Sequence, residues 1–278
     1  MNWNNAVRNV LLYGGLSAIA IVMLYPFLWS FTASFKTAAQ IYNGNPLDLW
    51  PDPFTFANYE RAWTVLPFYR FLLNSLFLAT VVPFFNILFA SMAAYSFSRL
   101  RFRGRDAVFI VLLAVMMLPG HITLIPNYSI IRELGWINEY KALVIPGIFG
   151  GALVINIFFF RQFFLSIPKD LDEAAIIDGC SRFGIWARII MPNARPAIAT
   201  LVILSFVTEW NAFLWPVVVI NDYMKMPIQV GLSYFKSSVT TDWGVLMAGT
   251  TISMIPMITV FLLFQRHFIK SLLTTGLK

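Results

Sequence analysis

Long apolar stretches alternate with short polar ones along this chain, and they predict membrane-spanning helices. Six stretches approach or exceed the roughly 20 apolar residues that a helix needs to cross the hydrocarbon core of a bilayer. They cover about residues 10–33, 71–97, 107–130, 142–164, 197–220 and 244–264. Pro119-Gly120 and Pro126 interrupt the third stretch, and such breaks are tolerated where a cavity or a neighbouring helix satisfies the freed backbone groups. The pattern therefore predicts an all-α integral membrane protein with one transmembrane domain over residues 1–278, whose core covers 70–266.

The longest charged segment between two apolar stretches covers residues 166–196, SIPKDLDEAAIIDGCSRFGIWARIIMPNARP. In a membrane protein such a segment must lie in water, so we expect it to face a soluble partner, and we call it the docking segment. Its first part predicts a helix that Asp170 caps and that has Asp172 and Glu173 in its first turn, where carboxylates meet the positive end of the helix dipole. Gly179 ends this helix, because glycine readily adopts the left-handed conformation found at helix C-termini.

The second part of the docking segment predicts another helix, which begins after Ser181 and ends at Pro192. Apolar side chains recur there at spacings of three and four residues, which gives the helix one apolar face. The apolar residues are Phe183, Trp186, Ile189 and Ile190. The arginines that we expect to remain in water are Arg182, Arg188 and Arg195.

Composition supports the membrane assignment. Hydrophobic residues make up 59% of the chain, charged residues only 12%, and the mean hydropathy is +0.72. A soluble fold with this composition would have too little polar surface, so the chain belongs in a bilayer. The single cysteine excludes an internal disulfide framework. The two histidines, His121 and His267, are far apart in the sequence, so we expect no metal site in this chain.

The net charge of +7 follows from the predicted topology. With six spans and a cytoplasmic N-terminus, 13 of the 20 Lys and Arg residues fall in cytoplasmic segments, in agreement with the positive-inside rule. Both termini are then cytoplasmic, and no basic stripe remains for nucleic acid. The basic turn Arg99–Arg105 has two explanations that stay open, contact with anionic lipid or contact with a soluble partner.

The docking segment resembles the EAA loop of ABC importer permeases. The residues that carry this resemblance are Glu173-Ala174-Ala175, Asp178-Gly179, Pro192 and Pro196. A wider resemblance, to permease subunits of carbohydrate importers, includes Arg161-Gln162-Phe163-Phe164, Trp210-Asn211-x-Phe213-Leu214-Trp215-Pro216, Asp242-Trp243-Gly244 and Leu273-Thr274-Thr275-Gly276. It covers the chain in order from about Asn74 to the C-terminus. Cys180 and Glu209 depart from it, because the family usually has alanine at the first position and a small residue at the second.

The resemblance implies the ABC type I importer permease fold, with six transmembrane helices. It implies a transport subunit, not an enzyme, that carries a sugar-like solute across the bacterial cytoplasmic (inner) membrane. The chain has no G-x-x-x-x-G-K-[ST] phosphate loop, so it binds no cofactor itself, and ATP and Mg²⁺ belong to partner subunits. The implied partners are a second homologous permease, two ATP-binding subunits, an extracytoplasmic substrate-binding protein and membrane lipid.

The resemblance also implies roles for particular residues. The docking segment would serve as a coupling helix, which passes closure of the ATPase pair to the spans as rigid-body tilting. The residues expected to dock on an ATPase are Asp172, Glu173, Ala174, Ala175, Asp178, Gly179, Cys180, Phe183, Arg188 and Pro192. Contacts with the substrate-binding protein are expected at Tyr223, Tyr234 and Phe235 in the outer turn. The tail from Leu273 to Lys278 would lie near the ATPase pair, or fray as a chain end.

Polar residues inside the predicted spans are candidates for the solute path. Glu209 lies near the midpoint of the fifth span, where an unpaired carboxylate costs at least about 2.5 kcal/mol, so it must face a cavity or a partner or be protonated. Glu209, Trp210 and Asn211 are the main candidates, because they combine groups that bond sugar hydroxyls with a ring that stacks on a sugar. A fixed hydrogen bond to the second permease is the alternative for them. Asn156 either bonds across helices or touches the solute, and His121 either lines the path or packs against another subunit.

Three other functions stay open at this stage. An intramembrane enzyme could use Glu209 and His121 as acid and base, although the chain shows no nucleophile motif. An ion-coupled carrier would act without an ATPase, although the paired interrupted spans of inverted repeats are not seen. A permease for a glycerol phosphate ester or another polyol would share the general pattern, since the sequence does not reveal the solute.

Overall fold

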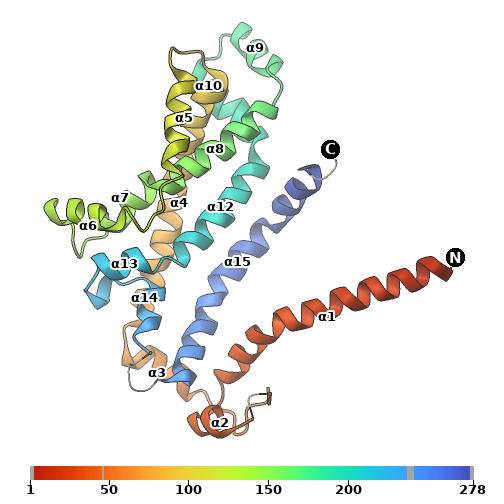
Figure 1. Ribbon diagram of the computed structural model, residues 1–278, viewed down its shortest axis with the longest axis vertical. Coiled ribbons are helices and arrows are strands. Elements are labelled where there is room, and N and C mark those ends of the chain that lie inside the picture. The colour runs from red at the N-terminus through yellow and green to blue at the C-terminus, as the bar shows by residue number, and fades with distance from the viewer. Residues whose placement is uncertain (1–2, 46, 237–240, 276–278) are drawn as a thin grey trace. The chain divides into compact units, whose positions relative to one another are not determined.

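The computed structural model describes residues 3–45, 47–236 and 241–275, and the side chains of residues 8–45, 47–236 and 241–265. The regular structure of these residues is helical, as predicted, apart from an isolated antiparallel bridge between Lys236 and Thr241. The chain forms two compact units (Figure 1). Unit 1 combines residues 1–68 with 231–255, and unit 2 combines residues 69–230 with 256–278.

Unit 1 contains α1 (Trp3–Ala33), α2 (Ala38–Asn43), α3 (Ala57–Val65) and the first part of α15 (Trp243–Thr275). Polar contacts hold the segment between α1 and α3: the buried Asn58 donates through Nδ2 to the carbonyls of Ser34 and Lys36, at 2.9 and 2.8 Å. The Phe35 ring stacks on Phe54 with 4.7 Å between centroids. These contacts hold the segment to unit 1, although the Phe54 ring remains 55% exposed.

Unit 2 contains most of the helices. They are α4 (Phe68–Arg99), α5 (Arg105–Val115), α6 (Leu124–Glu133), α7 (Lys141–Phe149), α8 (Gly151–Ser166), α9 (Asp170–Ile177), α10 (Arg182–Ile185), the π-helix η1 (Trp186–Ile190), α11 (Met191–Asn193), α12 (Arg195–Trp210), α13 (Leu214–Val219), the 3₁₀-helix η2 (Tyr223–Lys225) and the start of α14 (Ile228–Ser233). In Figure 1, α9 lies at one end of unit 2, and α13 and α14 lie toward the opposite end. Helix α8 contacts α5, α7 and α12, so it is central in this unit.

Four of the described helices are long and apolar enough to cross a membrane: Arg8–Ala33, Phe68–Arg99, Lys141–Ser166 and Trp243–Gln265. They correspond to the first, second, fourth and sixth predicted spans. A fifth candidate is the pair Arg182–Asn193 and Arg195–Trp210, which is bent by 79°. The described residues therefore contain four candidate spans, or five if the bent pair is counted as one.

The third predicted span, residues 107–130, is not one helix. Helix α5 ends at Val115 and α6 begins at Leu124, and turns connect them. Pro119 and Gly120 lie in this gap, and both residue types are poor helix formers. With 11 residues, α5 is about 16 Å long, roughly half of the hydrocarbon thickness. The predicted interruption at Pro119-Gly120 is therefore confirmed, whereas Pro126 lies inside α6 and does not interrupt it.

The fifth predicted span, residues 197–220, is also interrupted. Helix α12 ends at Trp210 and α13 begins only at Leu214. Glu209, which is near the midpoint of the predicted span, therefore lies next to the last residue of α12. The last carbonyls of a helix lack intrahelical partners. The Glu209 carboxylate therefore lies beside polar backbone groups at the end of α12.

A break at Gly150 separates α7 from α8 within the fourth span, where the backbone is extended (φ −78°, ψ −164°). A Cβ at this position would lie 2.5 Å from the carbonyl oxygen of Pro146, so the break requires glycine. Asn86 of α4 donates through Nδ2 to the carbonyls of Gly147 and Ile148, at 3.3 and 2.7 Å. These carbonyls belong to the last turn of α7, so Asn86 satisfies groups that a helix end leaves without partners.

The apolar core of unit 2 continues from the spans into the docking segment. Phe160 and Phe164 of α8 belong to the same buried cluster as Ile185 of α10 and Ile190 of η1. Burial of side chains of this size stabilises by about 1.5–3 kcal/mol each. The docking segment is therefore packed against the bundle and not attached to it by the chain alone.

Candidate functional site

The first helix of the docking segment is α9. It begins at Asp170, and its N-cap residue, Lys169, makes no capping hydrogen bond through its side chain. The prediction that Asp170 caps the helix was therefore wrong: this residue is the first helical residue. It shares the first turn with Asp172 and Glu173, which confirms the predicted carboxylates at the positive end of the helix dipole.

The end of α9 follows the prediction. Gly179 has a φ of +80°, in the left-handed region. The amide of Gly179 donates to the carbonyl of Ile176 at 3.0 Å, and the amide of Cys180 donates to that of Ala175 at 2.9 Å. This pair of hydrogen bonds is the Schellman arrangement, which satisfies two carbonyls at the helix end. The turn therefore depends on a backbone conformation that glycine adopts without strain.

The second helix begins as predicted but ends later. The Ser181 side chain accepts a hydrogen bond from the amide of Gly184 at 3.1 Å, which caps α10. The helix continues through the π-helix η1 and α11 to Asn193. Pro192 therefore does not end it, because it lies in the first turn of α11, where a proline is tolerated. The bend follows at Ala194.

The docking segment has one face against the bundle and one in solvent. The predicted docking residues that are buried are Asp172 and Ala175. Those that are exposed are Glu173, Ala174, Asp178, Gly179, Phe183, Arg188 and Pro192, and Cys180 is half-buried. Asp172 therefore faces the protein interior, and the surface available to a partner lies on the opposite side of α9.

Two large apolar side chains are the most exposed of this charged segment. Ile177 is 85% exposed and Phe183 is 63% exposed. The prediction grouped Phe183 with Trp186 on one apolar face, but only Trp186 is buried, and the Phe183 ring lies tilted 5.1 Å from it. Exposed apolar side chains on a charged segment are candidates for contact with a protein partner.

Asp172 lies in a charged environment at the base of α9. Its Oδ2 is 3.4 Å from Nε of Arg99, whose side chain is 2% exposed. Burial raises the pKa of the Asp172 carboxyl above its usual value; the Arg99 and Arg182 charges act in the opposite direction, without cancelling the effect of burial. A cavity of about 520 Å³ adjoins this pair and is also lined by Lys169 and Glu173.

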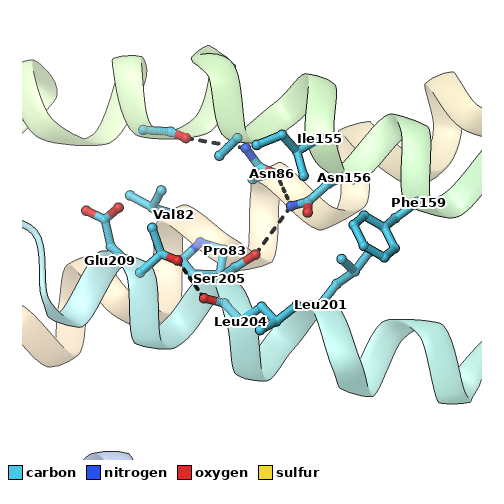
Figure 2. A pocket seen from close by; sticks show the side chains of 13 residues that line it. Val82, Pro83, Asn86, Ile155, Asn156, Phe159, Leu201, Leu204, Ser205 and Glu209 are labelled. Carbon is cyan, nitrogen blue, oxygen red and sulfur yellow. Dashed lines mark hydrogen bonds between the residues drawn. The ribbon is translucent and has the colours of Figure 1, made fainter. Parts of the chain in front are cut away.

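A small cavity of about 150 Å³ lies between α4, α8 and α12 (Figure 2). Glu209 of α12 lies at one end of it and Phe159 of α8 at the other. Asn156 donates through Nδ2 to Oδ1 of Asn86 at 2.7 Å and to Oγ of Ser205 at 3.3 Å. Asn156 therefore bonds across helices, which was one of its two predicted roles, and it also lines the cavity.

A second cavity, of about 370 Å³, brings two predicted path residues together. Glu209 and His121 both line it, although they are far apart in the sequence. Gly150, at the break between α7 and α8, lies on its wall, as does Trp215, whose Nε1 donates to the carbonyl of Ala142 at 2.9 Å. None of the described ion pairs includes Glu209, so its carboxylate stays available to hydrogen-bond a polar molecule in either cavity.

The other two main path candidates lie outside these cavities. Trp210 is 1% exposed, and its ring stacks on Phe206 with 5.6 Å between centroids. A ring in this position does not present a face to a solute, so its predicted stacking on sugar has no support in this geometry. Asn211 is exposed; it donates to the carbonyl of Val207 at 2.8 Å and accepts from Gln229 at 3.1 Å.

The predicted contacts for a substrate-binding protein differ in exposure. Tyr223 and Tyr234 are each 45% exposed, whereas Phe235 is 7% exposed and packs 6.5 Å from the Phe68 ring. The Phe235 ring belongs to the core of unit 1, so its side chain offers little surface to a partner. For the predicted tail contact, α15 continues to Thr275, and residues 276–278 lie outside the described residues.

Sequence reasoning missed four residues of these sites: Ile177, Arg99, Asn86 and Ser205. An apolar residue before Asp178-Gly179 in a charged loop was a usable signal for Ile177. Arg99 was hidden among the arginines of a basic turn, and only the fold distinguishes it. Within the described residues, no group of three or more His, Cys, Asp or Glu side chains is placed to hold a metal ion.

Comparisons with known proteins identify the family of this chain. Residues 86–274 match the family described as binding-protein-dependent transport system inner membrane component. The chain is 34% identical to the arabinooligosaccharides transport system permease protein AraQ of Halalkalibacterium halodurans, over 95% of this chain and 94% of that protein. It is 33% identical to the trehalose/maltose transport system permease protein MalG of Thermococcus litoralis, over 98% of both.

A similar fold is found in a crystal structure of a bacterial ABC transporter involved in the import of the acidic polysaccharide alginate. A chain of that transporter superposes with a TM-score of 0.84, covers 96% of this chain and 99% of its own length, and is 24% identical. This likeness shows the fold.

Proposed function

This chain belongs to the family of inner membrane components of binding-protein-dependent transport systems, and from that premise we propose that it imports a sugar or an oligosaccharide. As a permease subunit of an ABC importer, it is a multi-pass inner membrane protein and a transport component, not an enzyme. The family match over residues 86–274 carries the conclusion. Support for the solute class comes from relatives of nearly equal length that are named for arabinooligosaccharides and for trehalose and maltose.

We propose six membrane crossings with both termini in the cytoplasm. The third crossing would consist of α5, the turns that contain Pro119 and Gly120, and α6. Non-helical backbone at membrane depth is tolerated where it is buried in protein or lines a cavity, and Gly120 and His121 line the cavity of about 370 Å³ at Glu209. The excess of Lys and Arg in the segments on the side of the docking segment supports this orientation.

The docking segment would fit a groove of an ATPase subunit. Its solvent face supports this, since it combines the carboxylates Glu173 and Asp178 with the exposed Ile177 and Phe183. ATP and Mg²⁺ would bind to the ATPase pair, and closure of that pair would move α9 and, through the shared core, the spans. Asp172 and Ala175, on the inner side of α9, would hold this helix against the bundle.

The two cavities at Glu209 would form part of the solute path on this subunit. A carboxylate accepts hydrogen bonds from sugar hydroxyls, and Asn156 and His121 offer further polar groups on the cavity walls. Asn211 would bond the solute through its exposed amide at the end of α12. Trp210 would not touch the solute but would hold the end of α12 in place. A second homologous permease would complete the path from the opposite side.

A substrate-binding protein would deliver the solute on the outer side. Tyr223 and Tyr234 are the proposed contacts, because their rings are partly exposed. Phe235 would support Tyr234 from within unit 1. Large amphipathic side chains of this type supply contact area in many interfaces.

The test uses the assembled transporter. The chain is co-purified with its second permease and its ATPase pair, reconstituted in liposomes, and supplied with its binding protein. That binding protein is screened by thermal shift against sugars, oligosaccharides, sugar acids and glycerol phosphate esters. We expect a sugar or oligosaccharide to stabilise the binding protein and to stimulate ATP hydrolysis. Stabilisation by glycerol phosphate esters alone would reject the solute class, and uptake by the purified chain without an ATPase would favour a carrier.

The path assignment is tested by Glu209→Gln, which keeps the shape of the side chain and removes its charge. We expect a change in the solute concentration that half-stimulates ATP hydrolysis. Glu139→Gln is the matched control, because the Glu139 side chain is 50% exposed in the turn before α7. If both variants behave as the wild type in the assembled complex, Glu209 does not contact the solute.

A further inference from the structure

Arg99 differs from the other arginines of the basic turn. It is the last residue of α4, and its side chain is 2% exposed, whereas Arg101 and Arg103 are exposed. A buried arginine requires compensation, because a guanidinium loses its hydration and cannot give up its charge. The groups that contact Arg99 therefore indicate its role.

Two of these partners are backbone carbonyls at the end of α8. Nη2 of Arg99 donates to the carbonyl of Phe164 at 2.7 Å and to that of Ile167 at 2.6 Å. Helix α8 ends at Ser166, so these carbonyls belong to the last turn and the cap, where the helix itself leaves acceptors without partners. A cation is also favoured there by the helix dipole. Arg99 thus joins the end of α4 to the end of α8.

The third partner lies on the docking helix. Nε of Arg99 is 3.4 Å from Oδ2 of Asp172, a residue on the inner side of α9. One planar guanidinium therefore contacts three elements, α4, α8 and α9. The rigid fork of arginine suits this arrangement, whereas a lysine ammonium is a single point of charge on a flexible chain.

We propose that Arg99 is a positioning residue that transmits movement of α9 to the ends of α4 and α8. The proposal rests on the proposed function, in which an ATPase moves the docking segment. Displacing α9 alone would leave Arg99 and Asp172 as unpaired charges in a poorly hydrated site, which is unfavourable. The helices therefore move together when α9 is pushed, and the short connections on both sides of α9 do not absorb the movement.

Ala175 also anchors α9, through apolar contact with the core cluster, and it gives the arrangement its second point of attachment. Apolar contact resists separation but permits sliding, because it has no fixed direction. The hydrogen bonds from Arg99 to Phe164 and Ile167 are directional, so they hold the guanidinium in place at the end of α8, and the ion pair ties Asp172 of α9 to this fixed charge. This difference makes the Arg99 contacts suited to transmission.

The experiment compares Arg99→Gln, Arg99→Lys and Arg103→Gln in the complete transporter in liposomes. Arg103 is the matched control, because its removal changes the net charge equally at an exposed position of the same turn. For each complex we measure retention of the ATPase subunits, the rate of ATP hydrolysis and the number of solute molecules imported per ATP. The last ratio separates transmission from folding, because a purely structural defect lowers the amount of complex and not its stoichiometry.

We expect Arg99→Gln to retain the ATPase subunits and to lower the import ratio about tenfold, an effect of the size seen for residues of coupling networks. Arg99→Lys should restore part of the ratio, and Arg103→Gln should match the wild type. An unchanged ratio in Arg99→Gln overturns the proposal while leaving the proposed function intact.

Asp172→Asn decides the case in which Arg99→Gln does not assemble. It keeps the size of the side chain and weakens the contact with Arg99, so the ratio should fall here too, and an unchanged ratio overturns the proposal. Failure of the proposed function has a different signature. In that case the wild-type chain itself does not retain an ATPase, or its ATP hydrolysis does not respond to the loaded binding protein.

Discussion

Replacing Gly179 tests whether the turn after α9 is needed for coupling. Gly179 has a φ of +80°, and a Cβ built at this position meets no atom within 4 Å. A substitution is therefore strained only through its backbone and causes no steric clash with the rest of the chain. This allows two replacements of similar size to be compared: valine, which rarely adopts a positive φ, and asparagine, which does so more readily.

The expected cost follows from the left-handed conformation. It is about 1–2 kcal/mol for an ordinary L-residue. A difference of this size changes a two-state equilibrium by a factor of about 5–30. In Gly179→Val the hydrogen bonds from the Gly179 and Cys180 amides would be broken about 5–30 times more often than in the wild type, and the orientation of α9 toward α10 would be less well fixed.

The assay measures solute import and ATP hydrolysis by the reconstituted complex, with membrane insertion followed by yield and size-exclusion behaviour. We expect Gly179→Val to insert normally and to lose most import, while Gly179→Asn retains most of it. Normal import by the valine variant would refute the role of the turn in coupling. Equal losses in both variants would show that the side chain disturbs the partner surface, and the backbone argument would then be wrong.

Three further predictions concern stability and docking. Asn86→Ala should lower the free energy of unfolding by about 1–3 kcal/mol, because the buried carbonyls of Gly147 and Ile148 lose their donor. Thermal unfolding in detergent measures this loss, and Asn86→Asp should be at least as destabilising, because it places a buried carboxyl oxygen against the two carbonyls in place of the donor. Ile177→Ser should weaken ATPase binding about ten- to hundredfold, as measured by titration, with unchanged thermal stability of the isolated chain, because its side chain is 85% exposed. Burial raises the folded-state pKa of Asp172, so the folded protein holds this proton more tightly than the unfolded chain. The ionised carboxylate therefore costs stability above the raised pKa, and the cost disappears as the pH falls below the unfolded pKa. Thermal unfolding over a pH series should show the wild type gaining stability relative to Asp172→Asn as the pH falls through this window.

Several local features were predictable because they depend on short stretches of sequence. Apolar runs identified the first, second, fourth and sixth spans as helices, since length and hydropathy alone define a helix that can cross a bilayer. The end of α9 at Gly179 was predictable because backbone preference is a property of one residue. Breaks inside apolar runs were harder: Pro119-Gly120 indicated one, but nothing in the run around Asn211 marked the end of α12.

The sequence by itself determined that this chain is a membrane protein with a charged docking segment, because hydropathy and the docking pattern are both local. Only the tertiary structure decided which polar side chains meet. His121 and Glu209 line one cavity across many intervening residues, and Arg99 turns away from its basic neighbours to contact Phe164, Ile167 and Asp172. Such contacts depend on how distant helices pack, and two arginines of the same turn are alike in sequence until the fold buries one of them.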